Sequence, residues 1–400
     1  MPIWTLDDLT PDDLRGRRVF VRVDFNVPLD GEKVLDRTRL EAAMPTLREL
    51  MGAGARLVLA SHCGRPKGER NLRYSLKPVA AELAGLLGKD VAFADDCVGE
   101  VTEKAASALD DGDVLLLENL RFHAGEKAND PEFAAQLARL GDVFIGDAFG
   151  AAHRAHASVV GVAERLDAKA AGRLMTREVE ALSSLLGEPA RPFVAILGGA
   201  KIEGKIDTLE NLLPRLNGLI LGGGMANTFL TARGHDLANS LVEKERVGLA
   251  AEILARAEAQ GTEVLLPTDV VVTDDFASPH KIDTVDVAAV PESTLAVDVG
   301  PASRARFIEK AKTAGTLFWN GPLGVFEKPP FHEGTQAVAD ALAGCPGFTV
   351  IGGGETVAAV RRAGVAEQLG HVSTGGGASL ELLAGKALPG VEALSKGATS

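Results

Sequence analysis

The chain has 400 residues, so at about 150 residues per domain two sizeable domains are expected. Hydrophobic residues make up 46% and charged residues 24% of it, a balance that excludes a disordered, collagen-like or coiled-coil chain. The formal net charge is −13 and aromatic residues make up only 4%. Nucleic acids and membrane surfaces are therefore not expected as partners.

Cysteine usage and the N-terminus indicate the compartment. The three cysteines, Cys63, Cys97 and Cys345, lie far apart and form no C-x-x-C pair, so their spacing suggests neither a disulfide framework nor a zinc site. The first ten residues hold two aspartates and no apolar segment, and no run of 18 apolar residues occurs. We expect a cytoplasmic protein.

The first half of the chain repeats one pattern, in which a short apolar run leads into a loop rich in arginine, histidine, aspartate or asparagine and then into a helix-like stretch. The runs expected to form strands cover residues 17–28, 56–60, 114–117 and 143–145. This alternation predicts a parallel α/β sheet, and within the first run Arg22, Asp24 and Asn26 share one face. Loops beyond the carboxyl ends of parallel strands converge, so the cationic side chains should form one anion pocket; solvated surface groups are the alternative.

A capping pattern places one further arginine near this pocket. Thr38-x-x-Glu41 predicts a capping box that opens a helix ending near residues 52–54, with Arg39 in its first turn. A cation at that end opposes the helix dipole, which is weak support for a bound anion. A solvated arginine is the equal alternative.

The loops change their chemistry after a predicted connector. A helical pattern runs from about residue 167 to residue 187, followed by the proline-containing segment 188–192. Beyond it, glycine clusters follow residues 193–197, 219–221, 317–319, 348–351 and 373–374. Glycines let backbone N–H groups approach a phosphate, and a following helix adds a positive dipole end. The second half is therefore predicted to bind phosphates, with tight strand-to-helix turns as the alternative.

Two common nucleotide motifs fail in this half. Gly199-x4-Gly204-Lys205 is one residue short of a P-loop, because Ile206 stands where Ser or Thr would bind Mg²⁺. The three G-x-G sequences that begin at glycines 222, 352 and 375 lack the third small residue of the dinucleotide fingerprint. A nicotinamide-dependent dehydrogenase is therefore disfavoured.

Two lysines follow the first glycine cluster. Apolar residues at 202, 206, 209, 212, 213 and 216 predict a helix, with Lys201 and Lys205 on another face at i, i+4. Like charges at that spacing repel, so an anion between the two would relieve the pair. Solvated lysines are the alternative.

Taken together, these segments resemble the phosphoglycerate kinase family from about residue 6 to residue 394. The segments that carry the resemblance are RVDFNVP (22–28), SHCGRP (61–66), LENLRFH (117–123), DAFGAAHRAH (147–156), LGGAK (197–201), GGGM (222–225), WNGPLGVFE (319–327) and STGGGAS (373–379). The resemblance implies two Rossmann-like, doubly wound parallel-sheet α/β domains joined by a helical hinge. Residues 1–170 would bind 3-phosphoglycerate, 171–190 form the connector, 191–380 bind nucleotide, and 381–400 pack back on the N-terminal domain.

The implied reaction is the reversible, in-line transfer of a phosphoryl group from 1,3-bisphosphoglycerate to ADP after hinge closure, giving 3-phosphoglycerate and ATP in glycolysis. Mg²⁺ would be the cofactor and the protein would be a monomer. The attacking oxygen is already ionised, so no general base is required, and catalysis reduces to positioning and charge neutralisation. The alternative is a two-domain protein that binds a phosphorylated metabolite without catalysis.

The resemblance also implies the site residues. The substrate set is Asp24, Phe25, Asn26, Arg39, His62, Cys63, Gly64, Arg65, Arg121 and Arg154. The nucleotide set is Gly199, Ala200, Lys205, Gly223, Gly224, Leu241, Ala296, Val297, Asn320, Gly324, Val325, Glu327, Gly353, Gly354, Glu355 and Thr356. The catalytic set is Arg39, Lys201, Lys205, Gly353 and Gly376, and Glu355 would meet the metal.

Two positions depart from the family pattern. Glu355 stands where the family usually has the shorter aspartate, so Mg²⁺ coordination is expected to be shifted or to run partly through water. Cys63 stands at a position that is more often apolar. Beside His62 and Arg65 its thiol could have a lowered pKa, but a plain loop thiol is the favoured interpretation.

Overall fold

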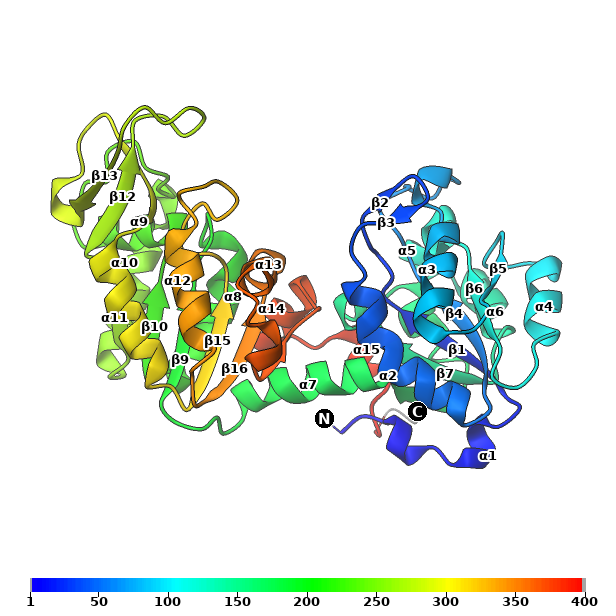
Figure 1. The fold of residues 1–400 in the computed structure, drawn as a ribbon. Coiled ribbons are helices and arrows are strands. Elements are labelled where there is room, and N and C mark those ends of the chain that lie inside the picture. Colours follow the sequence, from blue (N-terminus) through cyan, green and yellow to red (C-terminus); the bar gives the residue numbers. More distant parts are fainter. Residues whose placement is uncertain (1, 398–400) are drawn as a thin grey trace. The chain divides into compact units, whose positions relative to one another are not determined.

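The computed structural model describes residues 2–397, which divide into two compact units (Figure 1). Unit 1 comprises the chain up to Glu180 together with the segment from Ala387 onward, and unit 2 comprises Ala181–Lys386. The sequence places a separate connector at 171–190 and begins the returning segment at residue 381, so the two sets of bounds differ by several residues. No helix within residues 2–397 combines the length and the apolar character that a membrane span requires.

Unit 1 is built on a six-stranded parallel sheet. In spatial order its strands are β5 (Ala92–Ala94), β6 (Val114–Leu117), β4 (Arg56–Ala60), β1 (Arg18–Val23), β7 (Val143–Asp147) and β8 (Lys169–Ala171). Numbered in chain order within the sheet, this is 3-4-2-1-5-6. Apart from the edge strand β5, where Ala92 is exposed and Phe93 half-buried, the apolar strand residues are buried because helices cover the sheet, as all-parallel sheets require.

Most helices of unit 1 lie between successive strands of the chain, whereas the first helix precedes all strands and the last follows them. The helices are α1 (Pro11–Leu14), α2 (Thr38–Gly52), α3 (Lys77–Leu87), α4 (Glu100–Ser107), α5 (Ala124–Ala128), α6 (Pro131–Ala138) and, near the C-terminus, α15 (Pro389–Glu392). A small hairpin joins β2 (Leu29–Asp30) to β3 (Lys33–Val34). Leu40, Leu47 and Leu50 of α2 lie on one helix face and belong to the core beside β1 and β4.

Unit 2 repeats the architecture with another strand order. Its parallel sheet runs β11 (Glu263–Leu265), β10 (Gly218–Leu221), β9 (Phe193–Leu197), β15 (Thr316–Asn320), β16 (Phe348–Gly352) and β17 (His371–Val372). In chain order this is 3-2-1-4-5-6, the order of a dinucleotide-binding fold, with its switch point between β9 and β15. A second, antiparallel sheet of β13 (Ile282–Asp286), β12 (Asp269–Thr273) and β14 (Leu295–Val299) stands at one end of the unit.

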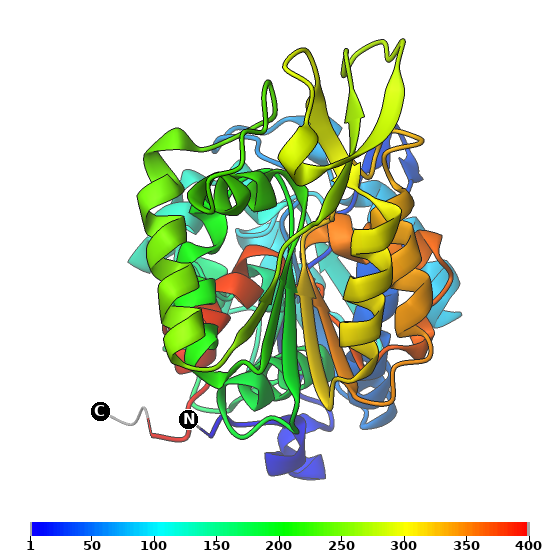
Figure 2. The same ribbon diagram turned by 90° about the vertical axis from the view of Figure 1, so that its left-hand side faces the viewer.

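Helices cover both faces of the large sheet in unit 2. They are α8 (Ile206–Leu212), α9 (Gly223–Ala232), α10 (Val247–Ala259), α11 (Pro301–Lys312), α12 (Glu333–Leu342), α13 (Gly354–Arg362) and α14 (Gly377–Leu383). Figure 2 shows the green helices α9 and α10 on one side of the strands and the yellow and orange helices α11 and α12 on the other. The predicted fold class, two doubly wound parallel-sheet domains, is therefore confirmed.

Two local predictions in the first half are wrong. The predicted helix over 167–187 contains strand β8, and α7 begins only at Arg173 and ends at Leu186. The predicted capping box also fails, because α2 begins at Thr38 itself. The Thr38 amide donates instead to Asp36 Oδ1 at 2.8 Å. Arg39 nevertheless lies in the first turn of α2, as predicted.

The last described residues are part of unit 1. The Trp4 amide donates to the Leu394 carbonyl and the Gly390 amide to the Ala152 carbonyl, each at 2.8 Å. Lys396 Nζ also pairs with Asp8 Oδ1 at 2.7 Å. The chain ends are thereby tied to one another within a single unit.

A buried carboxyl group connects the end of β7 to the start of α7. Asp147 Oδ1 accepts the Met175 amide at 3.1 Å, and Thr46 Oγ1 accepts the Arg173 amide at 2.8 Å. Burial raises the pKa of Asp147 to about 6, although hydrogen bonds from Thr46 and from the backbone at the start of α7 oppose the shift. The first turn of α7 therefore depends on a carboxyl group that costs free energy when it ionises.

This predicts how stability depends on pH. A folded-state pKa raised above the unfolded value means that the folded chain binds the extra proton, so the contribution of Asp147 to stability falls as pH rises through about 6. Asp147→Asn removes this dependence. Measured by chemical denaturation of the full chain, the stability of the variant relative to wild type should increase by about 1.5 kcal/mol from pH 5 to pH 8.

Asp142→Asn is the matched control. Its hydrogen bonds and ion pair with Arg18 hold the pKa of Asp142 below its ordinary value, despite partial burial, so this group stays ionised from pH 5 to pH 8. The stability difference between this variant and wild type should stay constant over that range. A constant difference for Asp147→Asn as well would contradict the prediction.

Candidate active site

The predicted anion pocket lies in unit 1, where β1, β4 and β6 end. Asp24 follows β1 and forms an ion pair with Arg39 of α2. His62 follows β4, and its Nδ1 lies 3.9 Å from Asp24 Oδ1 and 3.1 Å from Arg22 Nη2. The structure therefore brings together side chains from three separate segments that the sequence assigned to one pocket.

The loops after β1, β4 and β6 are hydrogen-bonded to one another. The Gly64 amide donates to Asn26 Oδ1 at 2.9 Å, and Arg121 Nη1 donates to the Gly64 carbonyl at 2.8 Å. Asn119 completes the connection, because its Oδ1 accepts the amides of Cys63 and Arg121 at 3.1 and 3.0 Å. These bonds hold the predicted substrate residues in one arrangement before any ligand binds.

Like charges gather in this pocket. Burial, followed by the charges of Arg22, Arg121 and Arg39, lowers the pKa of His62 well below its ordinary value, so the ring is neutral at pH 7. Burial and the charges of Arg22 and Arg154 lower the pKa of Arg121 to about 10. Arg121 still carries its charge at neutral pH, and its Nε is buried without a hydrogen-bond partner among residues 2–397. A bound anion would reduce the repulsion among the arginines and would accept a hydrogen bond from the unpaired Arg121 Nε.

The remaining predicted substrate residues differ in accessibility. Arg65 and Arg154 have exposed side chains and can reach a ligand. Phe25 is fully buried in the core, so only its backbone is available, and its amide donates to Ser61 Oγ at 2.8 Å. Cys63 is also buried, and burial, together with the charges of Glu118 and Asp24, raises the pKa of its thiol to about 11. The lowered pKa considered for this cysteine is wrong, and the favoured plain thiol stands.

A buried, hydrogen-bonded layer beneath the pocket lies outside the predicted site residues. Arg22 Nε donates to Ser158 Oγ at 2.8 Å, and Ser158 Oγ donates to Glu126 Oε1 at 2.6 Å, all in the buried interior. The strand alternation already places Arg22 on the face of Asp24 and Asn26, although the predicted substrate set does not include it. Glu126 and Ser158 carry no comparable sequence signal, since only the fold brings them under β1.

A cavity of about 340 Å³ lies in unit 2, between the glycine turns and the small antiparallel sheet. Predicted nucleotide residues that line it are Gly199, Ala200, Gly223, Gly224, Leu241, Ala296, Val297, Gly324, Val325, Glu327 and Glu355. Lining residues that the sequence did not indicate are Asn227, Pro267, Val270, Phe276, Leu295, Asp298, Val299, Pro322 and Leu323. The wall is mostly apolar with a few polar groups, as expected of a small-molecule site.

Asp298 lines the cavity, and its carboxyl group holds one wall in place through contacts with neighbouring segments. Its Oδ2 accepts the Gly334 amide at 2.7 Å and lies 3.3 Å from Arg304 Nη2. Burial raises the pKa of this carboxyl to about 7 despite these partners. A Cβ at Gly324 would lie 2.2 Å from Asp298 Oδ1, so only glycine fits there.

Other predicted nucleotide residues lie at the switch point beside the cavity. The Gly321 amide donates to Thr356 Oγ1 at 2.6 Å, and Lys205 Nζ donates to the Gly198 carbonyl. Asn320 Nδ2 is buried and lacks a hydrogen-bond partner in the described part of the chain; a Cβ at Gly353 would lie 3.1 Å from it. We refer to these groups, which lie at the turns after β9, β15 and β16, as the polar strip.

The predicted lysine pair is wrong as a helix motif. Glu203–Lys205 forms a 3₁₀ turn and α8 begins at Ile206, so Lys201 lies in the preceding loop with an exposed side chain. Lys205 is half-buried, and burial lowers its pKa although the charge of Glu355 opposes the shift. The two amines therefore occupy different surroundings. Gly354 begins α13, and Gly376, with a φ of 53°, precedes α14.

Glu355 satisfies what Mg²⁺ would require of this unit. Its carboxylate is exposed in the first turn of α13, lines the cavity and lies near the Lys205 charge. Mg²⁺ is usually held by one or two carboxylates together with substrate phosphates rather than by a full protein cage. The exposed Glu355 carboxylate, which lines this cavity together with Glu327 and Asp298, fits that pattern.

Comparisons with known proteins agree with this arrangement. The family model for phosphoglycerate kinase matches residues 6–386. A phosphoglycerate kinase of Moorella thermoacetica is 54% identical over 394 residues, covering 98% of this chain and 99% of the relative, and one of Pelotomaculum thermopropionicum is 51% identical over 382 residues, covering 96% and 97%.

Solved structures match over the whole fold. The phosphoglycerate kinase of Coxiella burnetii is 39% identical with a TM-score of 0.89 and full coverage of both chains. That of Pyrococcus horikoshii is 31% identical with a TM-score of 0.83, covering 98% of each chain. With two parallel-sheet units, a cationic pocket in one and an apolar cavity beside glycine turns in the other, the chain belongs to the phosphoglycerate kinase family.

Proposed function

We propose that unit 1 binds 3-phosphoglycerate or 1,3-bisphosphoglycerate and that unit 2 binds ADP or ATP. The reaction is that of the family, the reversible transfer of a phosphoryl group between 1,3-bisphosphoglycerate and ADP in glycolysis. The observation that carries the assignment of sites is the pairing of an arginine pocket short of counter-charge with an apolar cavity of about 340 Å³ in one chain. A protein that only binds a phosphorylated metabolite would need the first site and not the second.

In unit 1, the proposed ligand contacts divide by charge. Arg65, Arg121 and Arg154 would neutralise the phosphate, with neutral His62 as a hydrogen-bond partner. Asp24 and Asn26 would orient the hydroxyl and carboxyl end. Because Asn26 already holds the Gly64 amide, its orientation is fixed before the ligand arrives.

In unit 2, the apolar cavity would hold the adenine and the polar strip the phosphates. Val297, Val325 and Leu241 line the cavity and would supply apolar contacts for the base. Glu327, which also lines the cavity, and Asn320 would face the ribose. Lys205 and the backbone from Gly353 to Thr356 would meet the phosphates. The unused Nδ2 donor of Asn320 is consistent with a polar ligand group at this point.

Transfer requires fixed positive charge rather than a base. We assign Arg39 and Lys201 to the transferring phosphoryl group, with Lys205 on the nucleotide and the backbone at Gly353 and Gly376 assisting. Arg39 now pairs with Asp24, so that ion pair would have to loosen when Arg39 turns to the phosphoryl group. Direct transfer also requires the two ligands to meet, so the proposal includes a closing movement that excludes water.

Mg²⁺, held through Glu355 and the nucleotide phosphates, would supply charge neutralisation on the phosphate oxygens. Glu355 is one methylene longer than aspartate, so its carboxylate can reach further from α13 or meet the ion through water. We further propose that the protein is a cytoplasmic monomer. We propose no nucleic-acid or membrane partner, since the net charge of −13 repels such polyanions.

The catalytic assignment is tested by Lys201→Ala. A coupled assay that follows ATP formation from 1,3-bisphosphoglycerate and ADP should show kcat lower by at least about 100-fold, because a fixed cation on the transferring group is lost. Binding of 3-phosphoglycerate should be unchanged. Lys244→Ala, which removes another exposed lysine of unit 2, should leave kcat near wild type. A Lys201→Ala enzyme with near-normal turnover would refute this role.

The substrate pocket is tested by Arg65→Ala. Losing one charge-assisted contact should raise the Kd for 3-phosphoglycerate about 10-fold, and wild-type affinity should fall as salt increases. The measurement is calorimetric titration at two ionic strengths. Lys104→Ala changes the net charge equally, from an exposed pair with Glu100, and should leave the Kd unchanged. Equal effects of the two substitutions would mean that only overall charge matters.

The nucleotide cavity is tested by Gly324→Ala. The added methyl would meet Asp298 at 2.2 Å and displace the wall, so the Kd for ADP should rise about 10-fold while 3-phosphoglycerate binding persists. Gly248→Ala in α10 is the control, because apart from its chain neighbours and its own helix backbone no atom lies within 4 Å of its added Cβ. Unchanged ADP affinity in Gly324→Ala would place the nucleotide elsewhere.

A further inference from the structure

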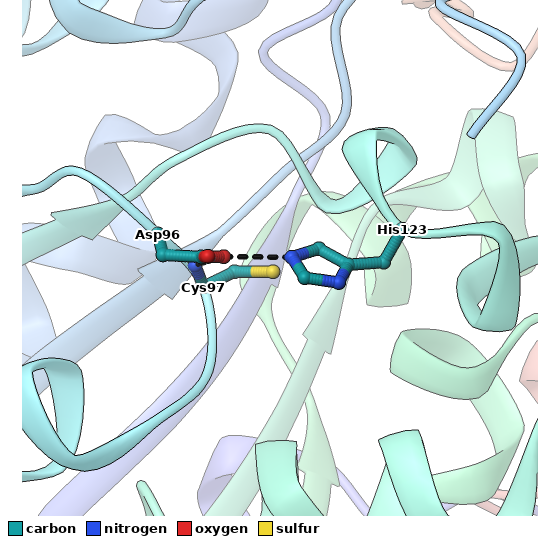
Figure 3. A group of neighbouring side chains, drawn as sticks. All are labelled: Asp96, Cys97 and His123. Carbon is teal, nitrogen blue, oxygen red and sulfur yellow. Dashed lines mark hydrogen bonds and ion pairs between the residues drawn. The ribbon is translucent and has the colours of Figure 1, made fainter. Parts of the chain in front are cut away.

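Three side chains of metal-ligand type converge in unit 1, apart from the residues assigned to either substrate. Asp96 and Cys97 lie in the loop between β5 and α4, and His123 lies between β6 and α5. Their ligand atoms all lie within 4.8 Å of one another, and within residues 2–397 they form the one such group of three. Figure 3 shows the carboxylate and the sulfur approaching the same edge of the His123 ring.

We propose that Asp96, Cys97 and His123 form a binding site for a zinc-type divalent cation. One carboxylate oxygen, one thiolate and one imidazole nitrogen are a ligand set that suits Zn²⁺ or Co²⁺, whereas a thiolate disfavours Mg²⁺. Three protein ligands leave a fourth, open position for water. The inference does not depend on the proposed substrate sites.

The present spacing is close to what a tetrahedral ion needs. Ligand bonds of about 2.0 to 2.3 Å place neighbouring ligand atoms roughly 3.3 to 3.7 Å apart. His123 Nε2 and Asp96 Oδ1 are now hydrogen-bonded at 2.7 Å, and no pair in the group exceeds 4.8 Å. The ion would replace that hydrogen bond, with side-chain shifts of about an ångström or less for the His–Asp pair.

The surroundings hold the ligands and leave a path for entry. The His123 ring stacks on Phe133 with centroids 5.1 Å apart, and Thr102 Oγ1 donates to the Asp96 carbonyl at 3.0 Å. The Asp96 and His123 side chains are 49% and 32% exposed, whereas Cys97 is buried. An ion can therefore approach from solvent through the two polar ligands and find the sulfur behind them.

The same group does not suit a cysteine nucleophile. Asp96 bonds the same ring edge that faces the sulfur, so it does not orient the imidazole from the far side as a catalytic triad requires. The thiol is also buried, out of reach of a substrate. Metal binding is the chemistry that this arrangement favours.

The test uses the full-length, chelator-treated protein titrated with Co²⁺ and, separately, with Zn²⁺. Wild type should bind one equivalent of either ion, and Co²⁺ should produce a thiolate-to-metal charge-transfer band. Cys97→Ser should abolish the band. Asp96→Asn and His123→Gln should weaken binding by more than about 100-fold, since losing even an outer partner of a ligand costs about 10- to 100-fold.

Cys345→Ser is the matched control, because Cys345 is a free cysteine of unit 2 and should leave the band and the stoichiometry unchanged. Circular dichroism checks that each variant is folded. If Cys97→Ser does not fold, the two variants of the exposed ligands still decide the question. Failure of wild type to bind one equivalent, or equal binding by the folded variants, would overturn the proposal.

Discussion

Both candidate ligand sites depend on one constraint, that parallel strands deliver their following loops to a single edge of the sheet. In unit 2 the chain order reverses between β9 and β15, and the turns that begin at Gly198 and Gly321 separate there. The backbones of the two turns still lie very close together, because a Cβ at Gly198 would lie 2.1 Å from the Pro322 carbonyl oxygen. The polar strip beside the cavity exists because glycine permits this approach.

The two units use that edge with opposite electrostatics. In unit 1 the loops after β4 and β6 bring guanidinium groups together, and Glu126 and Asp24 only partly offset the charge on Arg121. In unit 2 the wall of the cavity is mostly apolar, and the acidic side chains that line it are those of Asp298, Glu327 and Glu355. A chain with a net charge of −13 therefore concentrates positive charge where a small anion can use it. Charge summed over the surface says little about either site.

The fold was largely predictable from the sequence, because strands buried on both faces appear as continuous apolar runs between turn signals. The runs at 56–60, 114–117 and 193–197 match β4, β6 and β9 residue for residue. The wrong predictions are local, and in each case another hydrogen-bond partner or another backbone conformation replaces the expected one. The Thr38 amide donates to Asp36, whereas in the predicted capping box it would donate to the Glu41 side chain. A 3₁₀ turn replaces the helical spacing expected between Lys201 and Lys205.

Some residues of the candidate sites could be predicted from the sequence and others could not. Residues within one strand-to-loop segment, such as those around Asp24 and His62, could be placed from the sequence because each segment carries its own polar pattern. Partners that meet only through the fold could not, as with Asp298, whose carboxyl lies behind Gly324 and accepts the Gly334 amide. No spacing rule connects those positions before the strands are arranged.

The Asp96, Cys97 and His123 group shows how strand order decides such a meeting. In the order 3-2-1-4-5-6 seen in unit 2, the third strand lies beside the second, but in unit 1 β5 pairs instead with β6, the fourth. The pairing sets Ala94 opposite Leu117, so the loops that follow them leave side by side. Cysteine spacing along the sequence shows no such relation, which is why it suggests no zinc site. The exchanged strand brings the sulfur of one loop to the imidazole of the next.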